Sequence, residues 1–284
     1  MIVMVESGSL GNQIFQYLAL EGIRKTNERM LLFGFDQLKA TLNLPSQANF
    51  VHIQTNALKH LYSLDYNRVG RFQRKLRAFQ VVGEDTSGVV NVPKGSRLRL
   101  VEPSWFQNPA VFQSPISQGI EIKSEILEHS LTAFESIGFD PQETIVLHIR
   151  AGDYRTWPSD EFPAILTPNW YQVHVSQLRD QYPNLKVVAV GNEPEYISEV
   201  LRKVPDSVDL SSHFRSAYQI DFGVLSLCKY SIISASTFSL WARYFAHRRD
   251  SEAISIAPKF WAGHVIKEWY PANLQVEFLD YKEA

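Results

Sequence analysis

The chain has a single cysteine, Cys228, among its 284 residues. One thiol excludes a disulfide framework and a cysteine-built zinc cluster, and it agrees with a reducing compartment. No apolar run approaches the ~20 residues of a membrane-spanning helix. The apolar start, Met1–Val5, ends at Glu6 and has neither the basic residues nor the length of a signal peptide. We therefore expect a cytoplasmic protein.

An excess of charge of one sign is also lacking, because 28 Lys and Arg residues nearly balance 30 Asp and Glu residues. A net charge of -2 argues against a nucleic-acid partner that binds through a general basic field, whereas a small anion needs only a few local donors. The basic stretch Tyr66–Phe79 is expected to be the solvated face of a helix rather than a surface for membrane or nucleic acid.

Several catalytic motifs are absent. No Gly-Lys-Ser/Thr follows the first glycines, which disfavours an ATP-using kinase, and the G-x-G-x-x-G spacing of a dinucleotide fold is missing. The Gly-x-Ser-x-Gly and His-Glu-x-x-His motifs of two hydrolase classes are missing as well. No convincing Asp-x-Asp motif is present, so the sequence requires no metal ion.

What is present is an alternation of strands and helices. A strand at Ile2–Val5, a helix from Gln13 and a strand at Leu31–Phe35 open the chain. In the second half, predicted strands (144–149, 185–190, 230–235, 253–257) alternate with predicted helices (168–182, 194–203, 217–228, 238–247). This pattern predicts an α/β protein with two Rossmann-like, doubly wound lobes, residues 1–140 and 141–284, and a cleft between them.

The first candidate segment is the turn Gly8–Gln13, between the first strand and the first helix. Its glycines permit a close approach of the backbone. The N-terminus of the helix that follows favours an anion or a sugar hydroxyl. A purely structural turn explains the same residues equally well.

The second segment, His148–Tyr154, follows a predicted strand. Because side chains alternate along a strand, His148 and Arg150 share one face and Ile149 points to the other. A ring and a guanidinium at a strand end are costly for a pure core, and arginine suits bidentate binding of a diphosphate. Asp153 either holds Arg150 or acts as a general base. The competing interpretation is a structural Arg–Asp ion pair.

The third segment, Ser234–Trp241, turns from a strand into a helix and carries hydroxyls at Ser236, Thr237 and Ser239. Free N–H groups also point outward at a helix start, so the segment predicts a phosphate cradle. A capping residue explains one hydroxyl but not three in four positions so easily. Asn192, at the end of another predicted strand, is a candidate for contact with a nucleoside. The alternative is that it only forms a loop turn.

In this order the three segments resemble the family-11 glycosyltransferases, the bacterial and animal α-1,2-fucosyltransferases. The family signature Gly-Gly-Leu-Gly-Asn-Gln-x-Phe-Gln-Tyr is similar to residues 8–17, and His-x-Arg-Arg-Gly-Asp-Tyr is similar to residues 148–154. A third block, Asp-x-x-x-Met-x-x-Cys-x-x-x-Ile-x-x-x-Ser-x-Phe-Ser-x-Trp, is similar to Asp221–Trp241. Ser9 and Ala151 depart from the family, which usually has a glycine and a second arginine at these places.

The resemblance implies a GT-B type fold and metal-independent, inverting transfer of fucose from GDP-fucose to a galactoside hydroxyl, without a further cofactor. The resemblance implies that residues 1–140 form the lobe on the acceptor side and that residues 141–284 form the lobe that binds the donor. Arg150 is implied to hold the β-phosphate, and His148 to lie near the guanosine. The remaining implied contacts are Ser236, Thr237 and Ser239 for the phosphates, and Asn12 and Gln13, with Gly11 beside them, for the sugar. The catalytic candidates are Arg150, Asp153 and Asn12.

Two alternatives stay open. The first alternative is a transferase of the same fold that uses another nucleotide sugar. Two departures motivate it: Ala151, and the pair Asn192–Glu193, which stands where the family often has Ser-Asp-Asp. The second alternative is a catalytically silent protein that binds a glycan or a nucleotide. The base is open between Asp153 and Glu6. The expected partners are a nucleotide sugar and a glycan acceptor of unspecified identity, and peripheral association with membrane-linked acceptors stays open.

Overall fold

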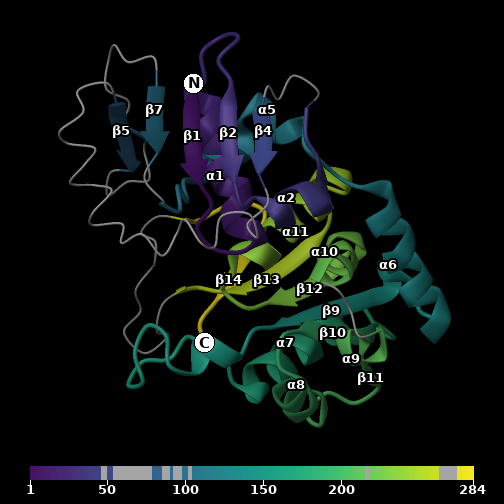
Figure 1. The fold of residues 1–284 in the computed structure, drawn as a ribbon. Helices are drawn as coiled ribbons and strands as arrows, with labels where there is room; N and C mark the ends of the chain where they lie inside the picture. The colour runs from purple at the N-terminus through teal and green to yellow at the C-terminus, as the bar shows by residue number, and fades with distance from the viewer. Residues whose placement is uncertain are drawn as a thin grey trace. The chain divides into compact units, whose positions relative to one another are not determined.

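The computed structural model of the chain describes residues 1–45, 50–53, 79–84, 90–91, 98–101, 104–214, 218–261 and 274–284. These residues form two compact units, Met1–Glu121 and Ile122–Ala284, each built around its own six-stranded sheet (Figure 1). The basic stretch at 66–79 lies outside the described residues apart from Phe79.

The division between the units falls after Glu121, whereas the sequence pattern places it after residue 140. The reason is helix α6 (Ser124–Ile137), which packs against α10 (Tyr218–Leu227) of the second unit. The two helices are so close that a Cβ on Gly223 would lie 2.1 Å from the Ser130 hydroxyl. A glycine is therefore needed at this contact.

The sheet of the first unit has the strand order β4–β2–β1–β7–β5–β6 and is parallel except for β6. Its strands are β1 (Ile2–Val5), β2 (Met30–Phe33), β4 (Phe50–Ile53), β5 (Phe79–Glu84), β6 (Val90–Asn91) and β7 (Leu98–Val101). Helix α1 (Leu10–Ile23) follows β1, and α2 (Asp36–Thr41) follows β2. Smaller elements are β3 (Leu42–Asn43), which pairs with β8 (Glu121–Ile122), a 3-10 helix (Pro109–Gln113) and α5 (Pro115–Gln118).

The sheet of the second unit is wholly parallel, in the order β11–β10–β9–β12–β13–β14. Its strands are β9 (Thr144–Ile149), β10 (Lys186–Gly191), β11 (Ser207–Asp209), β12 (Tyr230–Ile233), β13 (Ile254–Pro258) and β14 (Asp280–Lys282). The other helices are α7 (Pro168–Gln181), α8 (Pro194–Leu201), α9 (Leu210–Phe214) and α11 (Thr237–Arg249), with 3-10 turns at Pro141–Glu143 and Gly152–Arg155.

In order along the chain, the strands of the second sheet run 3-2-1-4-5-6, the order of a dinucleotide-binding sheet. The order reverses between β9 and β12. Their carboxyl ends therefore form the topological switch point at which open α/β sheets bind their ligands.

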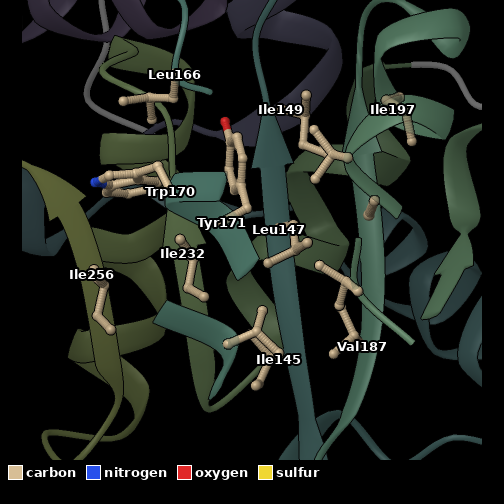
Figure 2. Close-up of a cluster of buried hydrophobic side chains, with 14 of the residues drawn as sticks. Ile145, Leu147, Ile149, Leu166, Trp170, Tyr171, Val187, Ile197, Ile232 and Ile256 are labelled. Atoms are coloured by element: carbon tan, nitrogen blue, oxygen red, sulfur yellow. The ribbon is translucent and has the colours of Figure 1, made fainter. Parts of the chain in front are cut away.

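Strand β9 is buried along its whole length, as expected of the central strand of a parallel sheet that is covered on both faces. Ile145, Leu147 and Ile149 belong to an apolar cluster with residues of α7 and α8 (Figure 2). His148 faces the other side, where its ring stacks on Phe238 of α11. The prediction that His148 and Ile149 face opposite sides of the strand is confirmed. That Arg150 shares the face of His148 stays a prediction.

Most predicted elements lie within one or two residues of the observed ones. The predicted cap of α7 is present, since the Thr167 hydroxyl accepts a hydrogen bond from the Trp170 N–H at 3.3 Å. Helix α6 and the strands β11 and β14 were not predicted; the two strands are three residues long and only partly buried, so they carry no clear alternation. Within the described ranges, no helix is long and apolar enough to cross a membrane.

Candidate functional site

The second and third sequence segments, far apart along the chain, meet at the switch point of the second sheet. The Ser234 N–H donates to the His148 carbonyl at 3.1 Å, which continues the pairing of β12 with β9. The Ser234 hydroxyl donates to the same carbonyl at 2.9 Å and accepts from the Arg150 N–H at 2.9 Å. The Tyr154 hydroxyl donates to the Ala235 carbonyl at 2.6 Å, so the two turns are tied a second time.

Arg150 is the first residue after β9, and one third of its side chain is exposed. Its Nη2 lies 2.9 Å from Oδ1 of Asp153, and its Cζ lies 5.3 Å from the centre of the Tyr154 ring. The Asp153 side chain is 60% exposed, and ion pairs this exposed contribute little stability. The buried Nε has no hydrogen-bond partner among the described residues. Arg150 therefore keeps donor capacity for a ligand.

His148 lies beneath this turn as a buried, uncharged ring. Its imidazole stacks on Phe238, with ring centres 5.7 Å apart. Burial, and then the charge of Arg150, lower its pKa to about 3, so it is neutral at physiological pH. Its buried Nδ1 has no hydrogen-bond partner within the part of the chain that the structure describes. A buried polar atom left in this state is unusual and marks a place where a ligand group or water can bind.

The start of α11 supplies the third set of groups. Ser236 is the N-cap, and its hydroxyl accepts from the Phe238 N–H at 3.3 Å. Ser239 is fully buried and donates to the Ser234 and Ser236 carbonyls, both at 3.1 Å, so this hydroxyl shapes the turn. Thr237 is half-buried at the first helical position. Of the three hydroxyls expected to bind phosphate, that of Thr237 is the one without an internal partner among the described residues.

The end of β10 anchors the turn that follows β9. The Asn192 side chain accepts from the Ala151 N–H at 3.0 Å, and the Glu193 carboxylate accepts from the Gly152 N–H at 2.7 Å. Gly152 has a φ of +59°, and a Cβ there would lie 3.0 Å from the Asn192 amide nitrogen. Arg155 pairs with Glu193 at 2.7 Å; that bond and the Gly152 N–H lower the pKa of Glu193. Asn192 thus has a structural role in this turn, and its contact with a nucleoside stays a prediction.

Ala151, which stands where the family usually has an arginine, is fully buried within the apolar cluster beneath the turn. The methyl group packs against the apolar cluster, and the N–H is held by Asn192. The turn thus carries its exposed positive charge on Arg150 and Arg155.

The first segment lies in the other unit, where its amides bond the protein itself. The Gln13 amide donates to Glu6 at 2.9 Å and to the Gly8 carbonyl at 3.3 Å, and it accepts from the Leu38 N–H at 2.9 Å. Asn12 is half-buried and accepts from Gln107 at 2.8 Å.

Gly11 is buried, and Glu6, the second candidate base, follows β1 directly. Burial raises the pKa of Glu6, against the lowering effect of the Gln13 bond, and the nearby Asp36 carboxylate raises it further. A half-buried carboxyl with a raised pKa is a better proton acceptor than an exposed one.

Two polar residues of the second unit were missed at the sequence level. Ser234 is the first residue of the third segment and was given no role, and Tyr171 lies within the predicted helix 168–182 without being singled out. Their hydroxyls lie 2.8 Å apart beneath Arg150. The sequence carries no signal for this contact, because it depends on which residues the sheet places side by side. Among the described residues, no group of three or more His, Cys, Asp or Glu side chains gathers to hold a metal ion.

The chain is similar to several known proteins. The chain is similar to the O-antigen biosynthesis glycosyltransferase WbnK of Escherichia coli, with 22% identity over 90% of this chain and 93% of that protein. It is similar to a structure of NodZ α-1,6-fucosyltransferase soaked with GDP-fucose, with a TM-score of 0.52, 15% identity, and coverage of 86% of this chain and 92% of the other. A POFUT1 complex with GDP-fucose gives a TM-score of 0.55 at 12% identity, with coverage of 90% and 97%.

The solved structures are too distant to show more than the fold, which is the expected GT-B type with two Rossmann-like units. The family model of glycosyl transferase family 11 matches residues 116–272, more than half of the chain and all of the β9 and α11 turns. The chain belongs to glycosyl transferase family 11 and is a glycosyltransferase.

Proposed function

We propose that this glycosyltransferase moves fucose from GDP-fucose to a galactoside hydroxyl of a glycan in an α-1,2 linkage, and that Arg150 holds the diphosphate of the donor. One observation carries the proposal: a partly exposed arginine and the N-terminus of α11 follow adjacent strands at the switch point of a 3-2-1-4-5-6 sheet. A helix N-terminus and a guanidinium are the two groups that proteins most often offer to a phosphate.

The names of similar proteins support the choice of donor. NodZ, similar in fold, is an α-1,6-fucosyltransferase soaked with GDP-fucose, and POFUT1, also similar in fold, is in complex with GDP-fucose. WbnK, similar over nearly the whole chain, is a glycosyltransferase of O-antigen biosynthesis. The acceptor and the linkage rest on the sequence resemblance alone. The proposal also includes a cytoplasmic site of action, with association with membrane-linked acceptors left open.

The proposed chemistry follows from charge. In an inverting transfer, the bond from the sugar to the diphosphate breaks, and negative charge gathers on the departing GDP. A phosphate oxygen replaces the exposed Asp153 carboxylate as the partner of Arg150. The main-chain N–H groups at the start of α11 stabilise the same negative charge. His148, neutral and buried, adds a hydrogen-bonding atom without a charge.

The sugar side of the proposal rests on the first unit. Asn12 is the better candidate of the two amides. Among the described residues its side chain has one hydrogen bond, accepted by its oxygen from Gln107, whereas the Gln13 amide is bonded at both ends. We keep the first unit as the acceptor side and the second as the donor side. The base stays a choice between Asp153 and Glu6.

A panel of nucleotide sugars tests the proposal, with calorimetry on GDP as the companion measurement. We expect GDP to bind and GDP-fucose to be hydrolysed or transferred in preference to other donors. If another nucleotide sugar turns over while GDP-fucose is inert, the fucose assignment is wrong. If GDP binds and no donor reacts with any galactoside tried, the chain is a silent binding protein. Absence of binding by any nucleoside diphosphate removes both interpretations.

A further inference from the structure

A pair of buried hydroxyls lies under the proposed diphosphate site. Tyr171 of α7 is fully buried, and Figure 2 shows its hydroxyl directed toward the carboxyl end of β9. Ser234, the first residue after β12, is buried as well. The two hydroxyl oxygens lie 2.8 Å apart, and both lie close to the His148 carbonyl, Ser234 at 2.9 Å and Tyr171 at 3.2 Å.

The hydrogen-bonding capacity of Ser234 is filled in one arrangement. A hydroxyl has one proton to donate and two lone pairs to accept with. Ser234 donates to the His148 carbonyl and accepts from the Arg150 N–H at 2.9 Å, and Tyr171 donates into the remaining lone pair. The main chain on both sides of the site is therefore tied to a single oxygen atom.

The same residue, through its carbonyl oxygen, connects Arg150 to the start of α11. The Ser234 carbonyl accepts from the Ser239 hydroxyl, which also bonds the Ser236 carbonyl at the cap of the helix. A shift of the β9 end would thus require the α11 turn to move with it. Groups that stabilise a developing charge act best when they are held in place before the reaction, because they then need no reorganisation.

We infer that Tyr171 and Ser234 are positioning residues of the donor site, which lock the main chain of Arg150 to the turn that begins α11. The inference rests on the proposed function, because it concerns the diphosphate that Arg150 and α11 would bind together. Neither hydroxyl touches the ligand. Each acts by fixing the distance between a guanidinium and a helix N-terminus that come from different strands.

The test compares Ser234→Ala and Tyr171→Phe with two controls. Tyr196→Phe removes another buried tyrosine hydroxyl of the same apolar cluster, which donates to the Leu166 carbonyl at 2.5 Å, away from the β9–β12 junction. Ser226→Ala removes a buried serine hydroxyl that bonds the Gly223 carbonyl within α10. Each control costs stability through the same kind of lost bond as its test variant.

We expect Ser234→Ala to weaken GDP binding by about tenfold, because it leaves the buried Arg150 N–H without its partner. Tyr171→Phe weakens it less, since Ser234 keeps its other two bonds. Amide exchange of the segment around Arg150 accelerates in Ser234→Ala. The controls lower the unfolding temperature to a similar degree and leave both GDP affinity and this exchange at wild-type values.

Three outcomes decide the matter. If both test variants lose stability but bind GDP as the wild type does, the positioning role is overturned and the proposed function stands. If the controls weaken GDP binding equally, the loss is general and the positioning role is again overturned. If the wild type binds no nucleoside diphosphate, the proposed function fails and the inference fails with it.

Discussion

The turn after β1 and the turn after β9 occupy matching places, each at the carboxyl end of a central strand in its own sheet. Their polar side chains are used in opposite ways. After β1, Gln13 bonds at both ends of its amide, and the Gln16 amide is bonded to the Ser7 main chain and the Ser104 carbonyl. At the end of β9, His148 within the strand and Arg150 directly after it each keep a buried nitrogen without a partner among the described residues.

The comparison shows two different reasons why a turn can have a distinctive sequence: to hold its own conformation, or to present groups to a ligand. The first turn is the most specific match to the family signature, and its amides are needed to hold the turn and α1 in place. The second turn is a weaker match, yet it is the one that leaves buried donors for a ligand. A strong motif therefore indicates a demanding conformation, whereas a buried polar atom without a partner marks a place where a ligand group or water can bind.

The largest expected effect is on the second turn. We expect Arg150→Ala to lower transfer and GDP affinity on the order of a hundredfold, because the developing phosphate charge loses its guanidinium. Arg150→Lys should lose less than Arg150→Ala, because lysine keeps the positive charge but lacks the planar guanidinium that binds two phosphate oxygens at once. Arg155→Ala, on the same turn but paired to Glu193, is the matched control with a small effect. Equal losses in both arginine-to-alanine variants would show a general field rather than a site.

The first turn is expected to respond through stability. Gln13→Ala should lower the free energy of unfolding by about 2–3 kcal/mol, because the buried Leu38 N–H loses its acceptor. Urea unfolding measures this, and Gln181→Ala, at an exposed position of α7, should stay within ~0.5 kcal/mol of wild type. A Gln13→Ala protein of unchanged stability that no longer transfers sugar would make Gln13 a ligand contact, and the contrast between the turns would be wrong.

How far the sequence predicts each region follows from the same contrast. The alternation of strands and helices predicts two α/β units, and it predicts that Arg150 follows a strand end, because these properties are local. The Ser234–Tyr171 contact and the buried Arg243, whose guanidinium bonds the Leu225 and Cys228 carbonyls and the Ser255 hydroxyl, could not be predicted. An arginine on a helix normally predicts a solvated face.

The hydroxyls of α11 show the same limit. Three hydroxyl side chains in four positions predict a phosphate cradle. In the structure, however, the Ser236 hydroxyl caps the helix and the Ser239 hydroxyl bonds two carbonyls. A hydroxyl that caps and one that faces a ligand have the same sequence signature. Only the geometry of the first turn of the helix separates Thr237 from its neighbours.

The pH dependence of stability tests the buried ring of the second turn. Because the pKa of His148 falls from 6.5 to about 3 on folding, the unfolded chain takes up more protons between these values. Its contribution to stability is present above pH 6.5 and is lost as the pH falls, by about 3 kcal/mol at pH 4.5.

Urea unfolding at pH 7.5 and 4.5 measures this difference, and His148→Phe should remove most of it. His174→Gln is the comparison variant. The pKa of His174 is also lowered, first by burial and partly restored by Gln177, but the ring is less enclosed, so the change should be smaller. An acid loss that survives in His148→Phe would mean that the ring is not held neutral beneath Arg150.

The smallest expected effect concerns the exposed partner of Arg150. Asp153→Asn removes a carboxylate that a diphosphate must displace, so GDP affinity should rise up to about fivefold, with a smaller gain at high salt. Asp160→Asn, on the same exposed loop, is the control. If Asp153 is instead the base, transfer falls on the order of a hundredfold or more while GDP binds at least as well. Weaker GDP binding in Asp153→Asn would show that Arg150 needs this carboxylate for its orientation, and the second turn would then resemble the first, with its polar groups committed to one another.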